Sequence, residues 1–357
     1  MEIVFNRTLL IDGSYMLHRQ LSVINQWDLQ TTTGKRTGGV FGVIKSVFKE
    51  MQKYNYFPIM VFDGGLAPRR LALYSNYKRN EEKQLLLEST SYTEKTEQQL
   101  MDEAFMREYR TQRKDIIEFM HGMGIPCIRI KDWEGDDLLY ILSKMSKDSI
   151  IISDDKDLIQ AAFEDENRRC RIWRTMHEEM LDTHILEKEG LNAWSYINRK
   201  AICGDPSDNI PSACYGVGEK TALDLIKLYE SCKLNNVSFP HDENSLADAC
   251  IKAGISKRKA YTNFDEAQFI INMELMNLKL VDNDITEQFV NKLYDEIMME
   301  LEMPDENIIR DKIEELEMFS LDTKSMRNKV IKLKDYLKIE DRQKVENHSE
   351  ETITHLF

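Results

Sequence analysis

The chain has 357 residues, 42% hydrophobic and 31% charged, so it is long enough for two domains with a large core. No apolar run reaches the ~18 residues of a membrane-spanning helix, and the six scattered cysteines form no CxxC pair, so we expect neither a membrane partner nor a zinc or disulfide framework. A net charge of −14 argues against nucleic-acid binding over the whole chain, but carboxylates that hold cations count as negative until the metal is bound.

Two short apolar strands near the amino terminus each end in an aspartate followed by glycine. Residues 8–11 lead into Asp12. Because this strand pattern begins directly after the first residues and these do not form a signal peptide, we expect a cytoplasmic protein. Residues 59–62 lead into Asp63 in the same way. A lone aspartate after a strand is usually a cap or turn residue, so neither of these by itself indicates a site.

Between and after these strands lie a flexible polar loop at 31–39, a helix at 40–51 with an apolar face, and a charged helical segment at 66–114. Basic residues interleaved with tyrosines cluster near the start of that segment. The common fate of such a charge run is a solvated helix face. Because it directly follows the Asp63 strand, however, we favour a flap that lines the path of a phosphodiester chain, with tyrosines as stacking surfaces.

Residues 132–157 carry an amphipathic helix followed by a buried β-branched strand at 149–152, which is typical of a parallel α/β unit. Six acids flank these two elements: Glu134, Asp136, Asp137, Asp154, Asp155 and Asp157. Acids in a first helical turn often only stabilise the helix dipole. Three strands that all end in acids would, however, gather negative charge at one sheet edge, which is costly unless a cation neutralises it.

A strand is expected within 125–130 and another within 168–174, and residues 178–203 have a helical pattern. Asp205 and Asp208 then add two acids. The Gly216-Val217-Gly218 hairpin precedes a helix that begins near Glu219 and carries Lys220. A glycine hairpin entering a helix presents free backbone N–H groups, which suits a nucleic-acid phosphate.

The carboxy-terminal third is helical in pattern. Residues 240–300 include a basic cluster at 257–259 and apolar side chains that we assign to the core: Phe269, Ile270, Met273, Leu275, Met276, Leu278 and Leu280. Residues 305–345 are charged and helical, and residues 346–357 have the composition of a disordered tail with an apolar tip.

Several of these motifs, LIDGS, VFDGG, YKRNEEK, WEGDD, SDDKDL and GDPSDNIP with GVGEKTA, occur in one order between residues 8 and 285. In this the chain resembles the flap endonuclease (5′ nuclease) family, especially its bacteriophage 5′-to-3′ exonuclease and RNase H branch. The resemblance implies a PIN-like α/β nuclease domain with a parallel sheet at 1–200, whose residues 66–114 form a helical arch or gateway. It further implies a helix–three-turn–helix DNA-binding domain at 201–300, followed by a charged helical extension at 301–357.

The resemblance also implies a metal site. Its ligand positions fall on Asp12, Asp63, Glu134, Asp136, Asp137, Asp155, Asp157, Asp205 and Asp208. We expect two Mg²⁺ ions, with Mn²⁺ as a substitute, because Mg²⁺ prefers oxygen ligands and keeps several waters. The first four acids would serve one ion and the last four the other, with Asp137 matching the second Asp of the motif. Asp154 is expected to cap or support, and Gly135 replaces the usual alanine.

Lys78 matches the gateway lysine of the family and is expected to polarise the scissile phosphate. The catalytic set is therefore Lys78, Asp12, Asp63, Glu134, Asp136, Asp155 and Asp157, with water as the nucleophile. The DNA-binding set is Arg19, Lys78, Arg79, Lys83, Lys200, Gly216, Gly218 and Lys220.

The resemblance implies a monomeric, Mg²⁺-dependent 5′-to-3′ exonuclease and flap endonuclease with RNase H activity. Substrates would be DNA and RNA–DNA duplexes with 5′ ends or flaps, as in the removal of RNA primers during phage DNA replication in the host cytoplasm. The carboxy-terminal HLF tip would dock on a single-strand-binding protein or a sliding clamp, or be an ordinary frayed terminus. Two alternatives are a non-catalytic DNA-structure-binding protein on the same fold and a small PIN-type RNase; the second does not account for GVGEKTA.

Overall fold

A parallel β-sheet is the centre of the computed structural model, which describes residues 4–23, 28–78, 97–163, 168–188, 190–231, 264–302 and 304–337. In these ranges six strands pair in the order β3-β2-β1-β4-β5-β6, and all but the β5–β6 pair are parallel. The strands are β1 (Phe5–Asp12), β2 (Phe57–Val61), β3 (Cys127–Ile128), β4 (Ser146–Ile152), β5 (Arg169–Arg174) and β6 (Glu179–Leu181). Leu9 is in register with both Pro58 and Ile150, so β1 lies at the centre.

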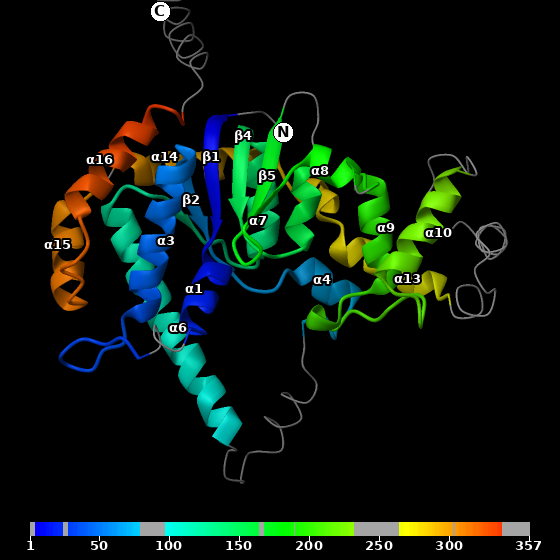
Figure 1. Ribbon diagram of the computed structural model, residues 1–357, viewed down its shortest axis with the longest axis horizontal. Coiled ribbons are helices and arrows are strands. Elements are labelled where there is room, and N and C mark those ends of the chain that lie inside the picture. Colours follow the sequence, from blue (N-terminus) through cyan, green and yellow to red (C-terminus); the bar gives the residue numbers. More distant parts are fainter. Residues whose placement is uncertain are drawn as a thin grey trace, which may run out of the picture.

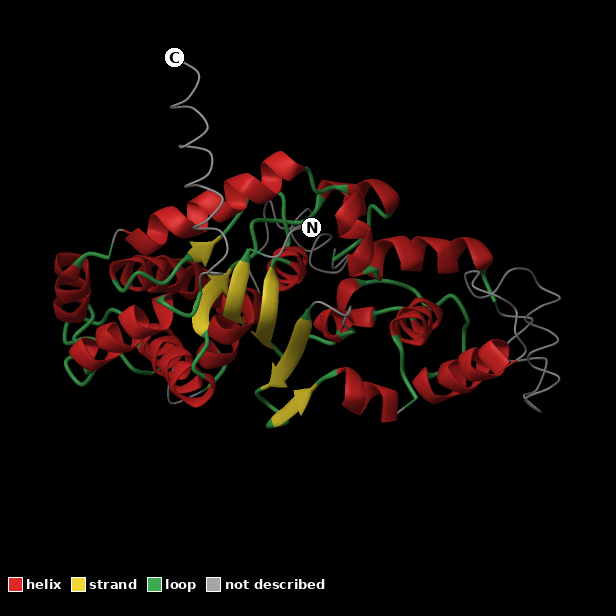
Figure 2. Ribbon diagram, turned by 90° about the horizontal axis from the view of Figure 1, so that it is seen from above, coloured by secondary structure: helices red, strands yellow, loops and turns green. Residues whose placement is uncertain are grey.

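Helices lie on both sides of this sheet, which is why its central strands are buried on both faces (Figure 2). The helices are α1 (Gly13–Leu21), α3 (Gly38–Tyr54), α4 (Pro68–Leu73), α6 (Glu97–Gly122), α7 (Gly135–Lys144), α8 (Thr183–Lys188), α9 (Ala193–Cys203), α10 (Glu219–Ser231), α13 (Glu266–Met276), α14 (Glu287–Glu302), α15 (Glu306–Glu315) and α16 (Thr323–Lys334). Short 3₁₀ helices are η1 (Asp157–Ala162), η2 (Pro206–Asp208) and η3 (Leu278–Asn283). None of the helices in these ranges has the length and apolar character needed to span a bilayer.

The predicted α/β class with a parallel sheet is confirmed, and the strands expected at 8–11, 59–62 and 149–152 are present. Three expectations were wrong in detail. Residues 179–181 form a strand rather than a helix, because a turn with Glu178 in the left-handed region (φ 51°) folds them back onto β5.

The loop at 31–39 is not a free loop, because an isolated bridge joins Gln30 to Arg36 and the Thr31 hydroxyl accepts the Lys35 N–H. Ile270 is 51% exposed rather than in the core, because α13 buries the opposite face, with Phe269, Leu275 and Met276.

The buried apolar side chains form two clusters. The first surrounds the sheet. The second joins α9, α10 and α13 with Tyr77, at one end of the molecule in Figure 1, opposite α15 and α16. Side chains from 278–301 and 309–337 pack in the first cluster. We therefore propose that the second domain ends near residue 277 and that the later helices belong structurally to the nuclease domain.

A partly buried lysine, Lys312, fixes the carboxy-terminal helices to α6. The Lys312 Nζ lies 2.8 Å from Asp115 Oδ1, 2.5 Å from Glu118 Oε2 and 2.8 Å from Glu315 Oε2. Lys35, from the loop before α3, lies 2.9 Å from the other Asp115 oxygen and 2.6 Å from Glu315. Three segments distant in sequence thus meet around the buried Asp115 carboxylate.

Lys312→Met is expected to lower the free energy of unfolding by about 2 kcal/mol, because it leaves three carboxylates facing one another around a single remaining lysine. Thermal unfolding followed by circular dichroism checks this. Lys292→Met is the matched control, since Lys292 is 75% exposed and pairs only with Glu296 one helical turn away; it should change stability by less than about 0.5 kcal/mol. Equal stability of the two variants would contradict the structural role of Lys312.

Candidate active site

Asp12 and Asp63 lie side by side at the carboxyl edge of the sheet, because β1 and β2 are neighbours and Asp12 is in register with Val61. The Asp12 carboxylate is buried and accepts hydrogen bonds from the Tyr15 N–H (2.8 Å) and the Ser153 hydroxyl (2.9 Å). Asp63 accepts the Gly135 N–H at 2.7 Å. A Cβ at Gly135 would stand 3.0 Å from that same carboxylate oxygen, so glycine at this position gives Asp63 room at the start of α7.

A cleft of about 540 Å³ opens above these acids. Its lining residues are Asp12, Ser14, Tyr15, His18, Asp63, Gly64, Gly65, Lys78, Met106, Tyr109, Arg113, Arg129, Asp136 and Asp155. Four of the predicted metal ligands and the predicted catalytic lysine therefore share one cavity. Asp63 and Asp155 are open to solvent there, whereas Asp136 is half-buried and Asp12 is buried.

Burial and mutual repulsion make this cluster reluctant to carry its full negative charge. Burial, with Asp63 and Asp155 nearby, raises the pKa of Asp12 from 3.8 to about 7, although Tyr15 and Ser153 donate to it. Burial and the charge of Asp155 raise the pKa of Asp136 well above its ordinary value, against the opposing effect of Lys78. A cation in the cleft would remove this electrostatic cost.

Asp12→Asn is expected to stabilise the metal-free protein at pH 8 and to have almost no effect at pH 4. The folded carboxyl keeps its proton up to about pH 7, whereas an unfolded one loses it near 3.8, so the wild-type stability contributed by this group falls as pH rises between those values. The gain at pH 8 should be on the order of 4 kcal/mol.

Denaturant unfolding in EDTA across this pH range measures the effect, with the exposed Asp311→Asn as the control. If the free energies of unfolding of the wild type and of Asp12→Asn differ by the same amount from pH 4 to pH 8, the pKa of Asp12 is not raised in the folded protein.

Glu134 differs from the other acids because protein donors occupy both of its oxygens. Oε1 accepts the Ala67 N–H (3.1 Å) and lies 2.9 Å from Arg70, while Oε2 accepts the Tyr77 hydroxyl (3.0 Å) and the Lys78 ammonium (2.7 Å). Burial would raise the pKa of Glu134, but Arg70 and Lys78 outweigh it and lower the pKa to about 2. Glu134 is thus ionised and fixed against Lys78, which lines the cleft, although Glu134 itself does not.

Lys78 lies between Glu134 and Asp208, one of the acids predicted to hold the second ion. Its backbone is in the left-handed region (φ 52°), its N–H donates to the Asp208 carbonyl at 2.8 Å, and its side chain is 29% exposed. Burial would lower the pKa of Lys78, but Asp136 and Glu134 outweigh it and raise the pKa, so the ammonium keeps its charge. Its Nζ is 3.7 Å from Asp208 Oδ2.

Of the remaining predicted ligands, Asp205 lines an adjoining pocket of about 420 Å³, together with Asp155 and Lys200. Lys200 there forms an ion pair with Asp157 and lies 3.5 Å from Asp205. Asp155 lines both this pocket and the main cleft, so the acids of the two cavities adjoin one another. In the ranges described, no three carboxylate, imidazole or thiolate groups already converge as ligands of a single ion. Mg²⁺ keeps several of its water ligands in proteins, so carboxylates can hold it partly through water.

The other predicted positions vary in how close they come to the cleft. Arg19 donates to the Thr175 hydroxyl at 2.7 Å, and Asp154 accepts from Tyr15, Thr175 and the Met176 N–H, which confirms its supporting role. The hairpin of Gly216 and Gly218 and the following Lys220 are exposed, with Gly216 at φ 83°. Arg79, Lys83 and the basic residues 257–259 lie outside the described residues.

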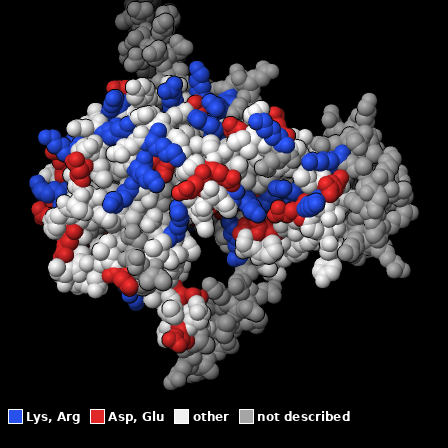
Figure 3. Space-filling view, viewed as in Figure 1, with Lys and Arg blue, Asp and Glu red and all other residues white. Residues whose placement is uncertain are grey.

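Several cleft residues were not selected from the sequence, notably Tyr109 and Arg113 on α6 and Arg129 after β3. Arg113 lies at the end of the charged segment 66–114, but only the packing of α6 against α1 and α3 brings it to the cleft. Figure 3 shows the face of the molecule seen in Figure 1. Lysine and arginine side chains spread over its upper part, with acidic groups interspersed. The overall negative charge is therefore compatible with local positive surface.

A parallel α/β sheet with a cluster of acids at its carboxyl edge is the architecture of a PIN-like nuclease domain. The family model described as "5'-3' exonuclease, N-terminal resolvase-like domain" matches residues 7–190, and the chain belongs to this family. The predicted family resemblance is thereby confirmed.

Among curated proteins, the chain is 25% identical over 321 residues to a 5'-3' exonuclease of Aquifex aeolicus, covering 87% of this chain and 92% of that protein. It is 29% identical to DNA polymerase I of Lactococcus lactis subsp. cremoris over 82% of this chain, but spans only 32% of that polymerase. Among solved structures, the T5 D15 protein co-crystallized with metal ions has the same fold, with a TM-score of 0.55 at 16% identity over 83% of this chain and 98% of that one.

Proposed function

We propose that this chain is a divalent-metal-dependent, structure-specific 5′-to-3′ exonuclease and flap endonuclease with RNase H activity. It would hydrolyse phosphodiester bonds at 5′ ends or flaps of DNA and RNA–DNA duplexes, and so remove RNA primers in phage DNA replication. The observation that carries this proposal is the cleft in which Asp12, Asp63, Asp136 and Asp155 face Lys78.

The donor set fits Mg²⁺, with Mn²⁺ as a substitute, because it consists of carboxylate groups. Four of these acids, Asp12, Asp136, Asp155 and Asp208, have raised pKa values that a cation would lower. One ion would be held by Asp12, Asp63 and Asp136 with Asp155 beside it, and a second by Asp155, Asp157, Asp205 and Asp208. Glu134, predicted as a ligand of the first ion, would instead hold Lys78, because protein donors occupy both of its oxygens. When bound, such cations supply the positive charge that activates water and stabilises the scissile phosphate.

The chain's own groups supply positioning and charge. Lys78, fixed by Glu134, would contact the scissile phosphate in the cleft that it shares with Asp12 and stabilise its developing charge. Arg113 and Arg129 in the cleft would hold flanking phosphates. The exposed hairpin of Gly216 and Gly218 would bind duplex phosphates without reading sequence.

The names of the relatives support this assignment. A solved T5 D15 flap endonuclease is described as a pseudo-enzyme-product complex with DNA and metal ions, and a second T5 5'-exonuclease structure as bound to zinc. We also propose that the protein acts as a monomer in the host cytoplasm. A sliding clamp or a single-strand-binding protein remains the proposed partner of the carboxy-terminal tip, which lies outside the described residues.

A substrate panel tests the proposal. The wild type, with Mg²⁺, Mn²⁺ or EDTA, is given a 5′-labelled DNA flap, an RNA–DNA hybrid with a 5′ end, and plain single-stranded RNA. We expect cleavage of the first two with either metal and none in EDTA. Binding of the flap without cleavage in any metal would favour a non-catalytic DNA-binding protein, and cleavage of single-stranded RNA alone would favour a PIN-type RNase.

A further inference from the structure

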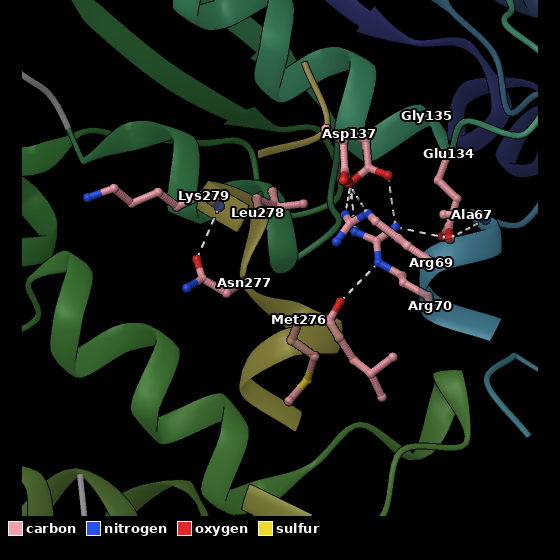
Figure 4. A network of polar contacts seen from close by, with 12 residues as sticks. Ala67, Arg69, Arg70, Glu134, Gly135, Asp137, Met276, Asn277, Leu278 and Lys279 are labelled. Carbon is pink, nitrogen blue, oxygen red and sulfur yellow. Dashed lines mark hydrogen bonds and ion pairs between the residues drawn. The ribbon is translucent and has the colours of Figure 1, made fainter. Parts of the chain in front are cut away.

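One guanidinium outside the cleft joins three separate parts of the site. Arg70 on α4 is only 3% exposed, yet each of its nitrogens has a partner. Nη1 and Nη2 donate to the two oxygens of Asp137 at 3.0 and 2.6 Å, and Nη1 also lies 2.9 Å from Glu134 Oε1. Nε donates to the Leu275 carbonyl at 3.0 Å. Figure 4 shows Arg69 and Arg70 pointing together toward Glu134 and Asp137.

The Leu275 carbonyl belongs to the last turn of α13, where helix carbonyls lack partners within the helix and carry partial negative charge. The same helix end is held a second time, because Gln160 on η1 donates to the Met276 carbonyl and accepts the Leu278 N–H. One turn earlier, the buried Asn272 amide donates to the carbonyls of Ala201 and Pro211 at 2.8 Å each. Helix α13 therefore connects Arg70 rigidly to the end of α9 and to the loop that carries Asp205 and Asp208.

On its other side, Arg70 determines which donors reach Glu134. Arg70 and the Ala67 N–H occupy Oε1, so Oε2 is left for Tyr77 and Lys78. Asp137, only 1% exposed, has both oxygens engaged by arginine, since Arg69 also lies 3.2 Å from Oδ1. Its carboxylate points to α4 rather than lining the cleft that contains Asp136.

We propose that Arg70 and Asp137 form a buried positioning unit that fixes Glu134, and through it Lys78, relative to the end of α13, and that Asp137 does not bind metal directly. This inference rests on the proposed nuclease function. Because α13 packs with α9 and α10, whose entry hairpin is the proposed duplex contact, the unit sets the distance between the duplex and the lysine at the scissile phosphate.

The test is a double-mutant cycle on the full chain with Arg70→Lys, Asp137→Asn and the pair combined. Lysine keeps the charge but cannot reach both carboxylates and the Leu275 carbonyl at once. We expect each single variant to lower kcat on a DNA flap by about 10- to 100-fold, with flap affinity in Ca²⁺ within about threefold of wild type. The double variant should be no worse than the poorer single one, because either change breaks the same unit.

Mn²⁺ binding without DNA, followed by electron paramagnetic resonance, supplies a readout independent of activity. Asp137→Asn should bind Mn²⁺ within about threefold of wild type, whereas Asp136→Asn should weaken binding at least tenfold. Arg171→Lys is the matched control, because Arg171 forms a similar pair with Asp148 at the opposite edge of the sheet and should leave kcat unchanged.

The inference would be overturned if the fold-losses in kcat of the two single variants multiply in the double variant. It would also be overturned if Asp137→Asn lowers the Mn²⁺ affinity tenfold. If circular dichroism shows that Arg70→Lys does not fold, Asp137→Asn and its Mn²⁺ affinity decide alone. A wild type that cleaves no substrate would count against the proposed function, while the Mn²⁺ comparison would still test whether Asp137 is a ligand.

Discussion

Replacing Asp155 and Asp157 with asparagine is expected to abolish Mg²⁺-dependent cleavage of a 5′ flap, by at least about 10³-fold, while flap binding stays within about threefold of wild type. Asp155 lines both acid pockets, and Asp157 faces Lys200 in the second. Their loss removes two of the charges that would hold cations at the scissile phosphate. The proposed DNA-binding surfaces at the start of α10 and in the rest of the cleft remain intact.

Single-turnover cleavage and fluorescence anisotropy with a labelled flap in Ca²⁺ separate the two effects. Asp132→Asn is the matched control: Asp132 is exposed near the same sheet edge, and asparagine tolerates its left-handed backbone (φ 66°). Turnover of the double variant near that of the control would refute the assignment of these acids as metal ligands.

Lys78→Ala is expected to lower kcat about 10²-fold and to weaken flap binding less than about fivefold. The lysine is held at 2.7 Å from Glu134, so its ammonium is preorganised, and a preorganised charge contributes most where charge develops during the reaction. Glu134 keeps its ion pair with Arg70 in this variant, so its position should be retained.

The comparison of kcat with the dissociation constant distinguishes the two roles of this lysine. Lys147→Ala, at an exposed position at the start of β4, controls for the loss of one positive charge. Weaker binding with unchanged kcat would demote Lys78 to a phosphate-positioning contact.

The sheet and its acidic edge could be predicted because each signal is local. Short apolar runs that end in Asp12, Asp63 and Asp155 specify both the strand and the position of the acid, and the parallel order then brings the acids together. Strand β6 could not be predicted, since its three residues are defined only by pairing with β5. The packing of residues 278–337 against the sheet could not be predicted for a similar reason, because helical spacing identifies a buried face but not the element that it packs against.

Within the site, the sequence identified residue types more reliably than their partners. Glu134 and Asp137 fit a ligand motif, but only the folded chain places Arg70, more than sixty positions earlier in the sequence, between them. The Lys78–Glu134 contact depends on a left-handed backbone at Lys78. Tyr109 and Arg113 reach the cleft through the packing of a long helix, for which no local pattern exists.

The most direct test of the account is anomalous diffraction from a crystal of the wild type soaked in Mn²⁺ at pH 8. If cations neutralise the acids at the sheet edge, a Mn²⁺ peak is expected among Asp12, Asp63, Asp136 and Asp155. A cleft without any anomalous peak, in which Glu134 and Asp157 keep their lysine partners while Mn²⁺ binds elsewhere, would contradict it.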